Sequence, residues 1–466
     1  MTTGPGPARN LHSRRSFLRQ ASRATALTAL SYSRVLGANE RVGIGVIGYG
    51  LIAKTHVATF RKLPEVDITA IAECHTQRAT DAVAAAGGKA TTYADFRKLL
   101  DDKSVDAVVV ATPDHWHALM TMLACAAGKD VYVEKPLSHF VQEGEWMQAV
   151  AGRTSRVVQV GTQQRSGAHY QKARELIRGG QLGKITSVRM SAVRNVFPGF
   201  GNPPDEPAPP ELDWQMWLGP APDRPYNRNR SLYHFRWFWD TSGGQMTNLG
   251  AHHLDIVDWI LGLEGLRQVS SIGGRYALQD NGETPDTQDA IFDCGKYSAG
   301  FVMREAARGE RPRFGLVFHG TRGSLGIDRS GFHVTADPDI PPMNQIPGIK
   351  EGHPSGGPVA KELIGELRNR TDTQEDTSGD SATQYLAHAR NFLDCIKSRK
   401  TPISDLASAQ RTAIACHLAN ISLRLGRSVK WNAAEQGVVN DREANNFLER
   451  PYRAPWDREL KALGVL

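Results

Sequence analysis

The sequence predicts an α/β protein in two parts: an N-terminal doubly wound parallel sheet, and a C-terminal α+β domain built on a large, open, mostly antiparallel sheet. Three observations lead to this prediction. Short apolar runs alternate with helical segments over residues 39–160, as in parallel sheets with helical crossovers. A glycine-rich turn joins the first of those runs to the first helical segment. Alternating apolar and polar residues recur between Leu266 and Asp328, which is typical of antiparallel strands.

The positive charge of the chain is concentrated at its N-terminus. The 466 residues carry a formal net charge of +7. Residues 1–38 contain six arginines and no Asp, Glu or Lys, so that segment accounts for nearly all of the excess. The remainder shows no cluster of basic residues interleaved with aromatics, and a nucleic-acid partner is therefore not expected.

The N-terminal segment resembles a twin-arginine export signal. Ser13 to Arg19 reads Ser-Arg-Arg-Ser-Phe-Leu-Arg and departs from that pattern only at its last position, and a mildly apolar stretch from Ala21 to Ala38 follows. We therefore predict a signal peptide over residues 1–38, recognition by the twin-arginine export machinery, and a periplasmic or otherwise exported mature protein. A disordered basic tail is the alternative. No other stretch is apolar enough to span a membrane.

A phosphate-binding fingerprint joins the first strand to the first helix. Residues 42–47 read as a buried strand, and the next six residues form the pattern Gly-x-Gly-x-x-Ala. Gly48 permits the tight turn, Gly50 lets the backbone approach a pyrophosphate, and Ala53 lets helix and strand pack closely. The candidate cofactor contacts here are Gly48, Tyr49, Gly50, Leu51, Ile52 and Ala53. Residues 39–160 are thus predicted to form a Rossmann-type dinucleotide-binding domain, with a glycine-rich turn of an unrelated α/β fold as the alternative.

The second strand ends in an acid that favours NAD. The apolar run Val66–Ala72 is followed at once by Glu73. A carboxylate at this place accepts hydrogen bonds from the adenosine ribose hydroxyls and repels a 2′-phosphate. NAD is therefore the predicted cofactor, and His75 and Arg78 nearby leave NADP as a less favoured alternative.

Two further buried strands end in polar side chains. Residues 105–111 lead into Thr112, Pro113, His115 and His117, and residues 130–133 lead into Glu134 and Lys135. Ligands of open α/β sheets bind at the carboxyl ends of the strands. These six residues are therefore predicted to contact the nicotinamide half of the cofactor.

Together these motifs resemble those of the Gfo/Idh/MocA family of NAD(P)-dependent oxidoreductases. Ala111 to His117 matches A-T-P-x-x-x-H, and Gly128 to Pro136 matches G-K-x-V-x-x-E-K-P. The export signal adds a resemblance to exported members such as glucose-fructose oxidoreductase and NAD-dependent glycosidases. The resemblance implies that Lys135 is catalytic, that Gln163 lies against the nicotinamide, and that the second-domain sheet mediates assembly into a homodimer or tetramer.

Lys135, Asn248 and His252 are the candidate catalytic residues. A lysine amine at a strand end beside the cofactor can hydrogen-bond a substrate hydroxyl, and burial lowers its pKa so that it can carry the proton. Residues 243–255 match the family pattern G-G-x-x-x-D-x-G-x-H-x-x-D, except that Asn248 stands in place of Asp. His252, one helical turn from Asn248, is predicted to be the general base. Asp255 either supplies the missing negative charge or holds the helix.

The second half is predicted to carry substrate contacts. Residues 161–430 are assigned to a substrate-binding and oligomerisation domain, and residues 431–466 to a polar C-terminal arm. The candidate contacts are Arg165, His169, Arg236, Trp237, Asp240 and His253, and a structural role is the alternative for Arg165, His169 and His253. Residues 195–240 contain nine prolines and four tryptophans, which predicts a long ordered excursion that forms either a carbohydrate pocket or a small separate core. Residues 336–384 read as an insertion or mobile loop.

We expect an NAD-dependent oxidoreductase that transfers a hydride between nicotinamide and a carbinol carbon of a sugar, glycoside or polyol. Two alternatives remain: a glycosidase that oxidises its sugar transiently with recycled NAD, and a catalytically inactive protein that binds a dinucleotide. No metal is predicted, because His115 and His117 have no third ligand at a convincing spacing and the five cysteines show no metal-binding pattern.

Overall fold

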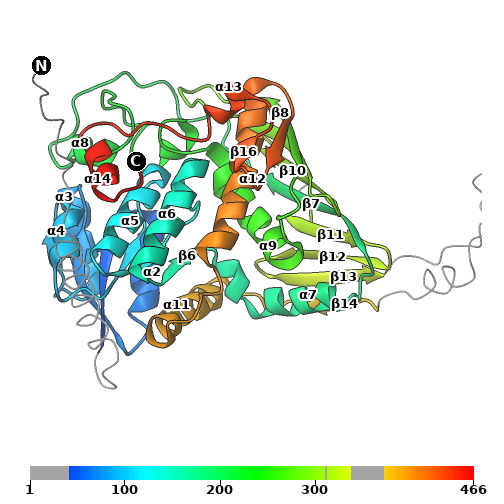
Figure 1. Cartoon of the computed structure of the whole chain (residues 1–466), viewed down its shortest axis with the longest axis horizontal. Coiled ribbons are helices and arrows are strands. Elements are labelled where there is room, and N and C mark those ends of the chain that lie inside the picture. Colours follow the sequence, from blue (N-terminus) through cyan, green and yellow to red (C-terminus); the bar gives the residue numbers. More distant parts are fainter. Residues whose placement is uncertain (1–40, 310–311, 337–371) are drawn as a thin grey trace, which may run out of the picture.

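The computed structural model describes residues 41–309, 312–336 and 372–466 (Figure 1). The predicted signal peptide, residues 1–38, and most of the predicted loop at residues 336–384 lie outside these ranges. The fold prediction is confirmed: the described residues form a six-stranded parallel sheet followed in the chain by a larger, mostly antiparallel sheet.

The first sheet has the strand order β3-β2-β1-β4-β5-β6, and all its pairings are parallel. Its strands are β1 (Val42–Ile47), β2 (Val66–Ala72), β3 (Thr91–Tyr93), β4 (Ala107–Val110), β5 (Asp130–Val133) and β6 (Val158–Val160). The strand order reverses between β1 and β4, so the carboxyl ends of these two strands border the crevice where doubly wound sheets bind ligands.

Helices cover both faces of the first sheet. They are α2 (Leu51–Phe60), α3 (Thr76–Ala86), α4 (Phe96–Asp101), α5 (His117–Ala126) and α6 (Val141–Thr154). On one face Leu119 of α5 and Met147 of α6 are buried in the core. On the other face Val57 of α2 packs with Phe392 of α11 (Ser381–Ser398), a helix from the second half of the chain. The two halves therefore share a core.

The second sheet has ten strands in the order β14-β13-β12-β11-β7-β10-β9-β8-β15-β16. Only β7 and β10 pair in parallel. The strands are β7 (Ile185–Val193), β8 (Gln268–Gly274), β9 (Thr287–Asp293), β10 (Ser298–Arg304), β11 (Leu316–Gly320), β12 (Gly323–Asp328), β13 (Gly331–Ala336), β14 (Gln374–Asp376), β15 (Val429–Asn432) and β16 (Gly437–Val438).

One face of the ten-stranded sheet packs against helices, and the other is exposed over several strands. Helices α7 (Ala168–Arg178), α9 (Ala251–Leu261) and α12 (Leu406–Leu425) share a core with the sheet (Figure 1). The opposite face presents Ile272, Ile291 and Val302, whose side chains are 70%, 63% and 38% exposed. Burial alternates along β9 and β10, as expected for strands with only one covered face.

The proline-rich segment at residues 195–240 packs around a small hydrophobic core of its own. It contains the short helix α8 (Trp214–Leu218) and a 3-10 turn at His234–Trp237. Its apolar cluster consists of Leu212, Trp214, Trp217, Leu218, Tyr226 and Phe235. The interpretation as a small separate core is therefore the correct one for these aromatics. We call residues 211–237 the strap.

The strap is fastened to the first sheet at two loops. After β2, Thr76 N donates to Glu211 O (2.9 Å) and Asp213 N donates to Cys74 O (2.9 Å). After β4, the indole Nε1 of Trp116 donates to Trp217 O (2.9 Å). The strap therefore crosses the carboxyl edge of the parallel sheet.

The C-terminal arm is less polar than predicted. It begins in β15, which pairs with β8, and continues through β16, α13 (Arg442–Asn445) and α14 (Trp456–Ala462). Trp456 is buried edge-on against Trp116, with ring centroids 4.8 Å apart. The arm returns to the first domain of its own chain because one side of α14 is apolar. No helix among the described residues is long and apolar enough to cross a membrane.

Candidate active site

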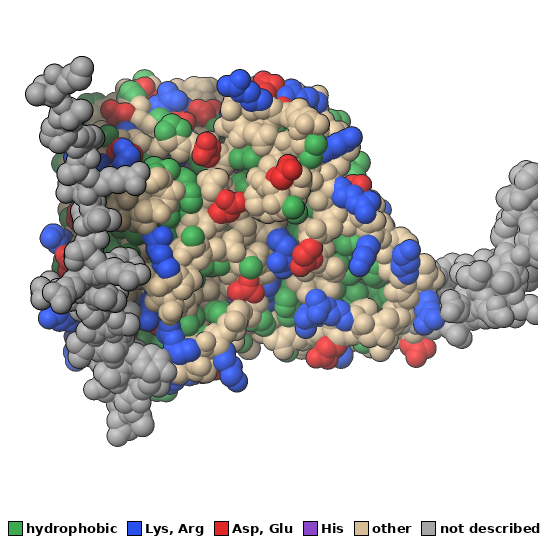
Figure 2. All heavy atoms as spheres, viewed as in Figure 1, with side chains coloured by type: hydrophobic (Ala, Val, Ile, Leu, Met, Phe, Trp, Pro, Cys, Tyr) green, Lys and Arg blue, Asp and Glu red, His purple; other side chains and the backbone are tan. Residues whose placement is uncertain are grey.

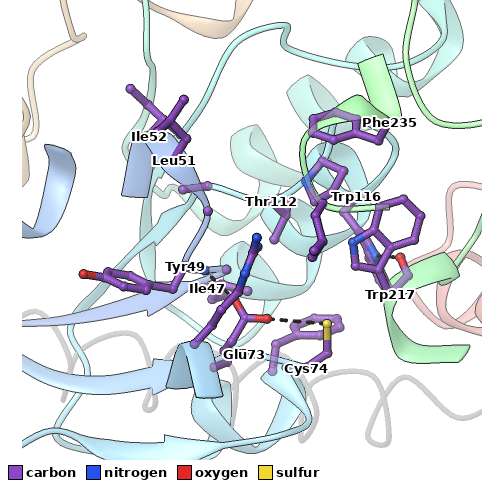
Figure 3. Close-up of a pocket in the computed structure, with 18 of the residues that line it drawn as sticks. Ile47, Tyr49, Leu51, Ile52, Glu73, Cys74, Thr112, Trp116, Trp217 and Phe235 are labelled. Atoms are coloured by element: carbon purple, nitrogen blue, oxygen red, sulfur yellow. Dashed lines mark hydrogen bonds between the residues drawn. The ribbon is translucent and has the colours of Figure 1, made fainter. Parts of the chain in front are cut away.

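A cavity of about 380 Å³ lies at the carboxyl ends of β1, β2 and β4 (Figure 3). Its floor is the glycine-rich turn. Gly48 has a φ of +83°, and a Cβ there would come within 2.8 Å of Thr112 Cγ2, so the turn requires glycine. A Cβ at Gly50 would meet no atom within 4 Å. The space above Gly50 therefore admits a phosphate close to the backbone.

Glu73 is held rigidly at the edge of this cavity. Its Oε2 accepts a hydrogen bond from Tyr49 N (2.6 Å), and its Oε1 accepts one from His75 N (3.0 Å). Figure 3 shows the ring of Tyr49 directed away from the other labelled side chains. Deeper in the cavity, the hydroxyl of Thr112 is buried and has no partner in the structure. A fixed carboxylate, an unused hydroxyl and an open glycine turn fit a dinucleotide.

Many of the predicted cofactor contacts line the cavity. They are Gly48, Tyr49, Gly50, Leu51, Ile52, Glu73, Thr112 and Pro113, joined by Arg236, which had been predicted as a substrate contact. Ala53 is fully buried behind the turn, which agrees with its predicted packing role. The strap closes the opposite side of the cavity with Trp217, Tyr233 and Phe235.

Four other predicted cofactor contacts do not line the cavity, because their side chains are bonded to other parts of the protein. His117 has Nδ1 2.6 Å from Pro136 O and Nε2 3.0 Å from Thr112 O, so it ties the two strand-end loops together. His115 Nε2 lies 3.2 Å from Trp217 O and helps to hold the strap. Glu134 is paired with His56 (2.8 Å). Gln163 is buried and hydrogen-bonded to Tyr385.

Lys135 and Asn248 meet across the two domains, as the sequence predicts. Lys135 Nζ donates to Asn248 Oδ1 (2.8 Å) and to Asn248 O (3.1 Å). Asn248 Nδ2 donates to Gln245 Oε1 (2.9 Å), and Gln245 Nε2 donates to Glu305 Oε1 (2.9 Å). This chain of hydrogen bonds fixes the orientation of the Asn248 amide, so that its oxygen faces the lysine.

The pKa of Lys135 is lowered to about 8. Burial is the main cause, and the cations Arg236 and Arg329 add to it, while Glu134 and Asp114 act in the opposite direction. A neutral amine has two N–H groups, and Asn248 accepts two hydrogen bonds from it. The nitrogen lone pair is then free to take a proton.

His252 differs from the prediction. Arg329 Nη2 donates to His252 Nε2 (3.2 Å), and His252 Nδ1 is buried without a partner. Burial, Lys135 and Arg329 lower the pKa of His252 well below 6.5. The imidazole is therefore neutral at physiological pH, and it is a weak proton acceptor. The better-matched proton acceptor is Lys135, whose pKa lies near the working pH.

Arg329 is a site residue that the sequence analysis missed. It lies in the turn between β12 and β13, about 80 residues beyond the catalytic motif, and no local pattern marks it. Only the pairing of β12 and β13 brings it to His252. Gln245 was likewise not singled out, although it lies inside the motif.

Arg165, predicted as a candidate substrate contact, has a structural role. Its guanidinium binds Asp255 through Nη2 (2.7 Å) and Nε (2.9 Å), and both residues are buried. Of the two roles considered for Asp255, it therefore holds α9 rather than supplying charge to His252. A buried Arg–Asp pair has no donors or acceptors left for a ligand at that contact.

The remaining candidate contacts lie outside the cavity. His169 Nε2 is 2.9 Å from Asp328 O, Trp237 Nε1 donates to Glu305 (2.6 Å), and Asp240 pairs with Arg224 (2.8 Å). His253 is packed near Phe301 in the second core. Each of these side chains is engaged in packing or internal bonding. In the described ranges no three His, Cys, Asp or Glu side chains gather as metal ligands.

Comparison with known proteins agrees with this geometry. The model of the oxidoreductase family, NAD-binding Rossmann fold, matches residues 42–162. The model of the C-terminal alpha/beta domain of the same family matches residues 166–272 and 371–458.

Among relatives, myo-inositol 2-dehydrogenase of Thermotoga maritima is 22% identical over 85% of this chain and 97% of its own. The scyllo-inositol 2-dehydrogenase (NADP(+)) of Bacillus subtilis is 24% identical over 77% of this chain and 87% of its own. The solved structure of levoglucosan dehydrogenase with NADH and levoglucosan superposes with a TM-score of 0.62 at 18% identity, covering 84% of this chain and 99% of that one. The chain belongs to the Gfo/Idh/MocA family of NAD-binding oxidoreductases.

Proposed function

We propose that this chain is an NAD-dependent dehydrogenase of a sugar, glycoside or polyol, and that Lys135 is the residue that exchanges the hydroxyl proton. The proposal rests mainly on the position of Lys135. Lys135 follows β5, and β5 pairs with β4. Thr112 and Pro113, in the loop after β4, line the dinucleotide cavity. The inositol and levoglucosan dehydrogenases among the relatives support a carbohydrate hydroxyl as the substrate group.

Lys135, Asn248 and His252 have different roles in the proposed reaction. When bound, the nicotinamide supplies the hydride acceptor. Lys135 takes the proton of the substrate hydroxyl on its free lone pair, and Asn248 keeps the amine oriented through two hydrogen bonds. The neutral His252 contributes a hydrogen bond to the substrate. In the reverse direction the ammonium of Lys135 donates to the developing alkoxide.

We propose NAD as the cofactor. Both oxygens of Glu73 are engaged by backbone N–H groups, so the carboxylate cannot turn away from an adenosine ribose. Its fixed negative charge disfavours a 2′-phosphate. Arg78 also lines the cavity and is the counter-argument for NADP.

We further propose that the protein is exported by the twin-arginine route and acts in the periplasm or beyond. Support comes from the motif at Ser13 to Arg19 and from the concentration of positive charge in residues 1–38. This route carries proteins that are already folded, so a cofactor held in a closed cavity would be exported with its protein.

A glycosidase that recycles its NAD is the second candidate, and the strap favours it. The strap closes the cavity with three aromatic side chains and is hydrogen-bonded to both neighbouring loops. A cofactor covered on one side by the strap would suit a reaction that returns it to the oxidised state within each turnover. The same Lys135 and Asn248 would serve both reactions.

The test is to purify the protein without added cofactor, to identify the released dinucleotide by mass spectrometry, and then to supply sugars, polyols and aryl glycosides. We expect NAD or NADH in the released fraction and net NADH formation with added NAD. Release of an aglycone without net NADH would identify the recycling glycosidase instead. If the protein contains no dinucleotide and its melting temperature is unchanged by NAD, the proposed function is wrong.

A further inference from the structure

The cationic side chains at the active site form no direct ion pair with a carboxylate of the described residues. Lys135, Arg236 and Arg329 have no carboxylate within ion-pair distance among residues 41–309, 312–336 and 372–466. Lys135 contacts only the neutral Asn248, and Arg329 contacts only the neutral His252. By contrast, the buried Arg165 has the full carboxylate of Asp255.

The nearby carboxylates are all occupied. Asp114 accepts a hydrogen bond from Ser242 Oγ, and Glu134 is paired with His56. Asp328, beside Arg329 in sequence, accepts from the backbone and hydroxyl of Ser330. Where other members of the family have an Asp, this chain has the uncharged Asn248. Glu134 and Asp114 still raise the pKa of Lys135 electrostatically, but no carboxylate in the described part of the chain is in direct contact with the Lys135 amine or the Arg329 guanidinium.

Arg329 is placed to supply the missing contact. The backbone of its turn is fixed, since Gln384 Nε2 donates to Arg329 O (3.1 Å) and His169 Nε2 lies 2.9 Å from Asp328 O. Its side chain is exposed, and one guanidinium nitrogen lies against His252. A guanidinium has five N–H donors in a planar fork, so most of them remain available to a ligand.

We propose that the substrate is a sugar acid and that Arg329 binds its carboxylate next to the hydroxyl that Lys135 deprotonates. This inference rests on the proposed dehydrogenase function. One guanidinium fork matches one carboxylate through two parallel hydrogen bonds. The same contact would draw Arg329 away from His252 and free Nε2 to accept a hydrogen bond from a neighbouring hydroxyl of the substrate. Arg329 Nη2 lies 3.2 Å from His252 Nε2, so the guanidinium stands beside a predicted catalytic residue.

A phosphate ester is the other anionic group that an arginine binds. A phosphate ester carries close to two negative charges, which are usually balanced by a cluster of cationic side chains rather than by one arginine. The structure presents a single exposed guanidinium beside His252, and this favours the carboxylate.

The experiment compares neutral and acidic partners of the same carbon skeleton on the NAD-loaded protein. The probes are glucose with glucuronate, galactose with galacturonate, and sorbitol with gluconate, and glucose 6-phosphate is the phosphate probe. Binding is read from the melting temperature in the presence of NADH, and turnover from NADH absorbance in the presence of NAD. The variants are Arg329→Gln and, as a control with the same loss of charge, Arg313→Gln, whose exposed side chain pairs with Glu375 of β14.

We expect at least one acid to bind and react better than its neutral partner. Arg329→Gln should reduce kcat/KM for that acid by about 10- to 100-fold, mainly through KM, as for the loss of a charged hydrogen bond. Because Arg329 also contacts His252 and helps to lower the pKa of Lys135, the neutral partner serves as the reference, and the ratio of kcat/KM for the acid to that for its neutral partner should fall by about tenfold or more. Arg313→Gln should leave both values unchanged.

Three results would overturn the inference. The neutral partners bind better than the acids, or glucose 6-phosphate is preferred, or Arg329→Gln weakens acidic and neutral substrates equally. The binding measurement does not require turnover. An acid that stabilises the NADH complex through Arg329 without being oxidised would therefore support the carboxylate contact but not its assignment as the substrate, and absence of NADH formation with every probe would count against the dehydrogenase function.

Discussion

At the scale of single residues, the contact between Lys135 and Asn248 decides the protonation chemistry. The lysine is held 2.8 Å from an amide oxygen where a carboxylate would stabilise the ammonium. Burial, together with two nearby arginines, lowers its pKa to about 8, and the neutral Asn248 does not offset this shift as a carboxylate would. The neutral amine therefore becomes the main form above pH 8, and the ammonium below it. The oxidised cofactor adds positive charge and shifts this midpoint further down.

The pH profile of sugar oxidation should follow this titration. Oxidation needs the neutral amine, so kcat/KM is expected to rise with pH and to level off above about 8. The change Asn248→Asp places a negative charge beside Lys135 and should raise that midpoint by about 1 to 3 pH units. Rate measurements between pH 6 and pH 10 check both statements. An unchanged profile in Asn248→Asp would show that Lys135 is not the group that titrates.

Glu73 should determine the choice between NAD and NADP. Glu73→Gln removes the negative charge and one acceptor, so NAD binding should weaken by about 10- to 100-fold. NADP should be affected less, because its 2′-phosphate is no longer repelled. Isothermal titration of the cofactor-free protein with each dinucleotide measures this. Asp81→Asn is the control, since it removes the same charge from another residue that lines the cavity, and its effect on the NAD-to-NADP ratio should be small.

Residues whose position follows from a local motif could be found from the sequence. Gly48, Gly50 and Glu73 line the cavity as predicted, whereas Lys135 lies outside its lining and contacts Asn248. Arg329 and the structural pairing of Arg165 could not be foreseen, because both depend on contacts between distant segments.

At the scale of elements, the strap is the feature that distinguishes the cofactor cavity. Trp214 and Trp217 stack with centroids 4.8 Å apart at an interplanar angle of 13°. Only Trp217 also lines the cavity, and its backbone oxygen receives the indole N–H of Trp116. The strap is therefore an independent small core with one side turned to the cofactor.

Replacing Trp217 with alanine should increase the rate at which the cofactor dissociates. Trp217→Ala removes a wall of the cavity, whereas Trp214→Ala removes the same bulk from the cluster without opening the cavity. Each is expected to cost about 3–5 kcal/mol of local stability, as for other buried tryptophans. Only Trp217→Ala should increase the NADH dissociation rate, by about tenfold or more, measured by displacement in stopped flow. Equal rates in the two variants would show that the strap does not retain the cofactor.

Elements with strong periodicity were predicted well, and irregular ones were not. The strands at Val66–Ala72 and Asp130–Val133 have the expected bounds. The C-terminal arm was read as polar because its buried residues, Tyr452, Trp456 and Leu460, are widely spaced. These three residues face the same direction only in the folded arm, in which α14 packs on the first domain.

At the scale of the whole molecule, the exposed face of the ten-stranded sheet suggests how copies of the chain associate. Ile272, Val302 and Asp289 form one row across β8, β9 and β10, and Ile291 lies on the same face. On the side of the molecule in Figure 2, Lys and Arg are interspersed with Asp and Glu. Three exposed apolar side chains on one face, with Asp289 between two of them, fit a surface that a partner covers.

A charge placed on that face should separate the subunits. We expect a dimer or tetramer in solution, and Ile291→Glu should convert it to smaller species because the charge would have to be buried. Light scattering after size exclusion gives the mass directly. Val439→Glu is the control, since this residue is 40% exposed but lies on the C-terminal arm. A monomeric wild-type protein would contradict the expectation.

The central claim is that Lys135 takes the proton of a carbohydrate hydroxyl at a dinucleotide site. Single-turnover formation of NADH in NAD-loaded protein tests it most directly, with Lys135→Ala compared with Lys62→Ala, an exposed lysine on the same domain. The account predicts that Lys135→Ala still binds NAD but forms NADH about 100- to 10,000-fold more slowly, while Lys62→Ala matches the wild type. NADH formation by Lys135→Ala at the wild-type rate would contradict it.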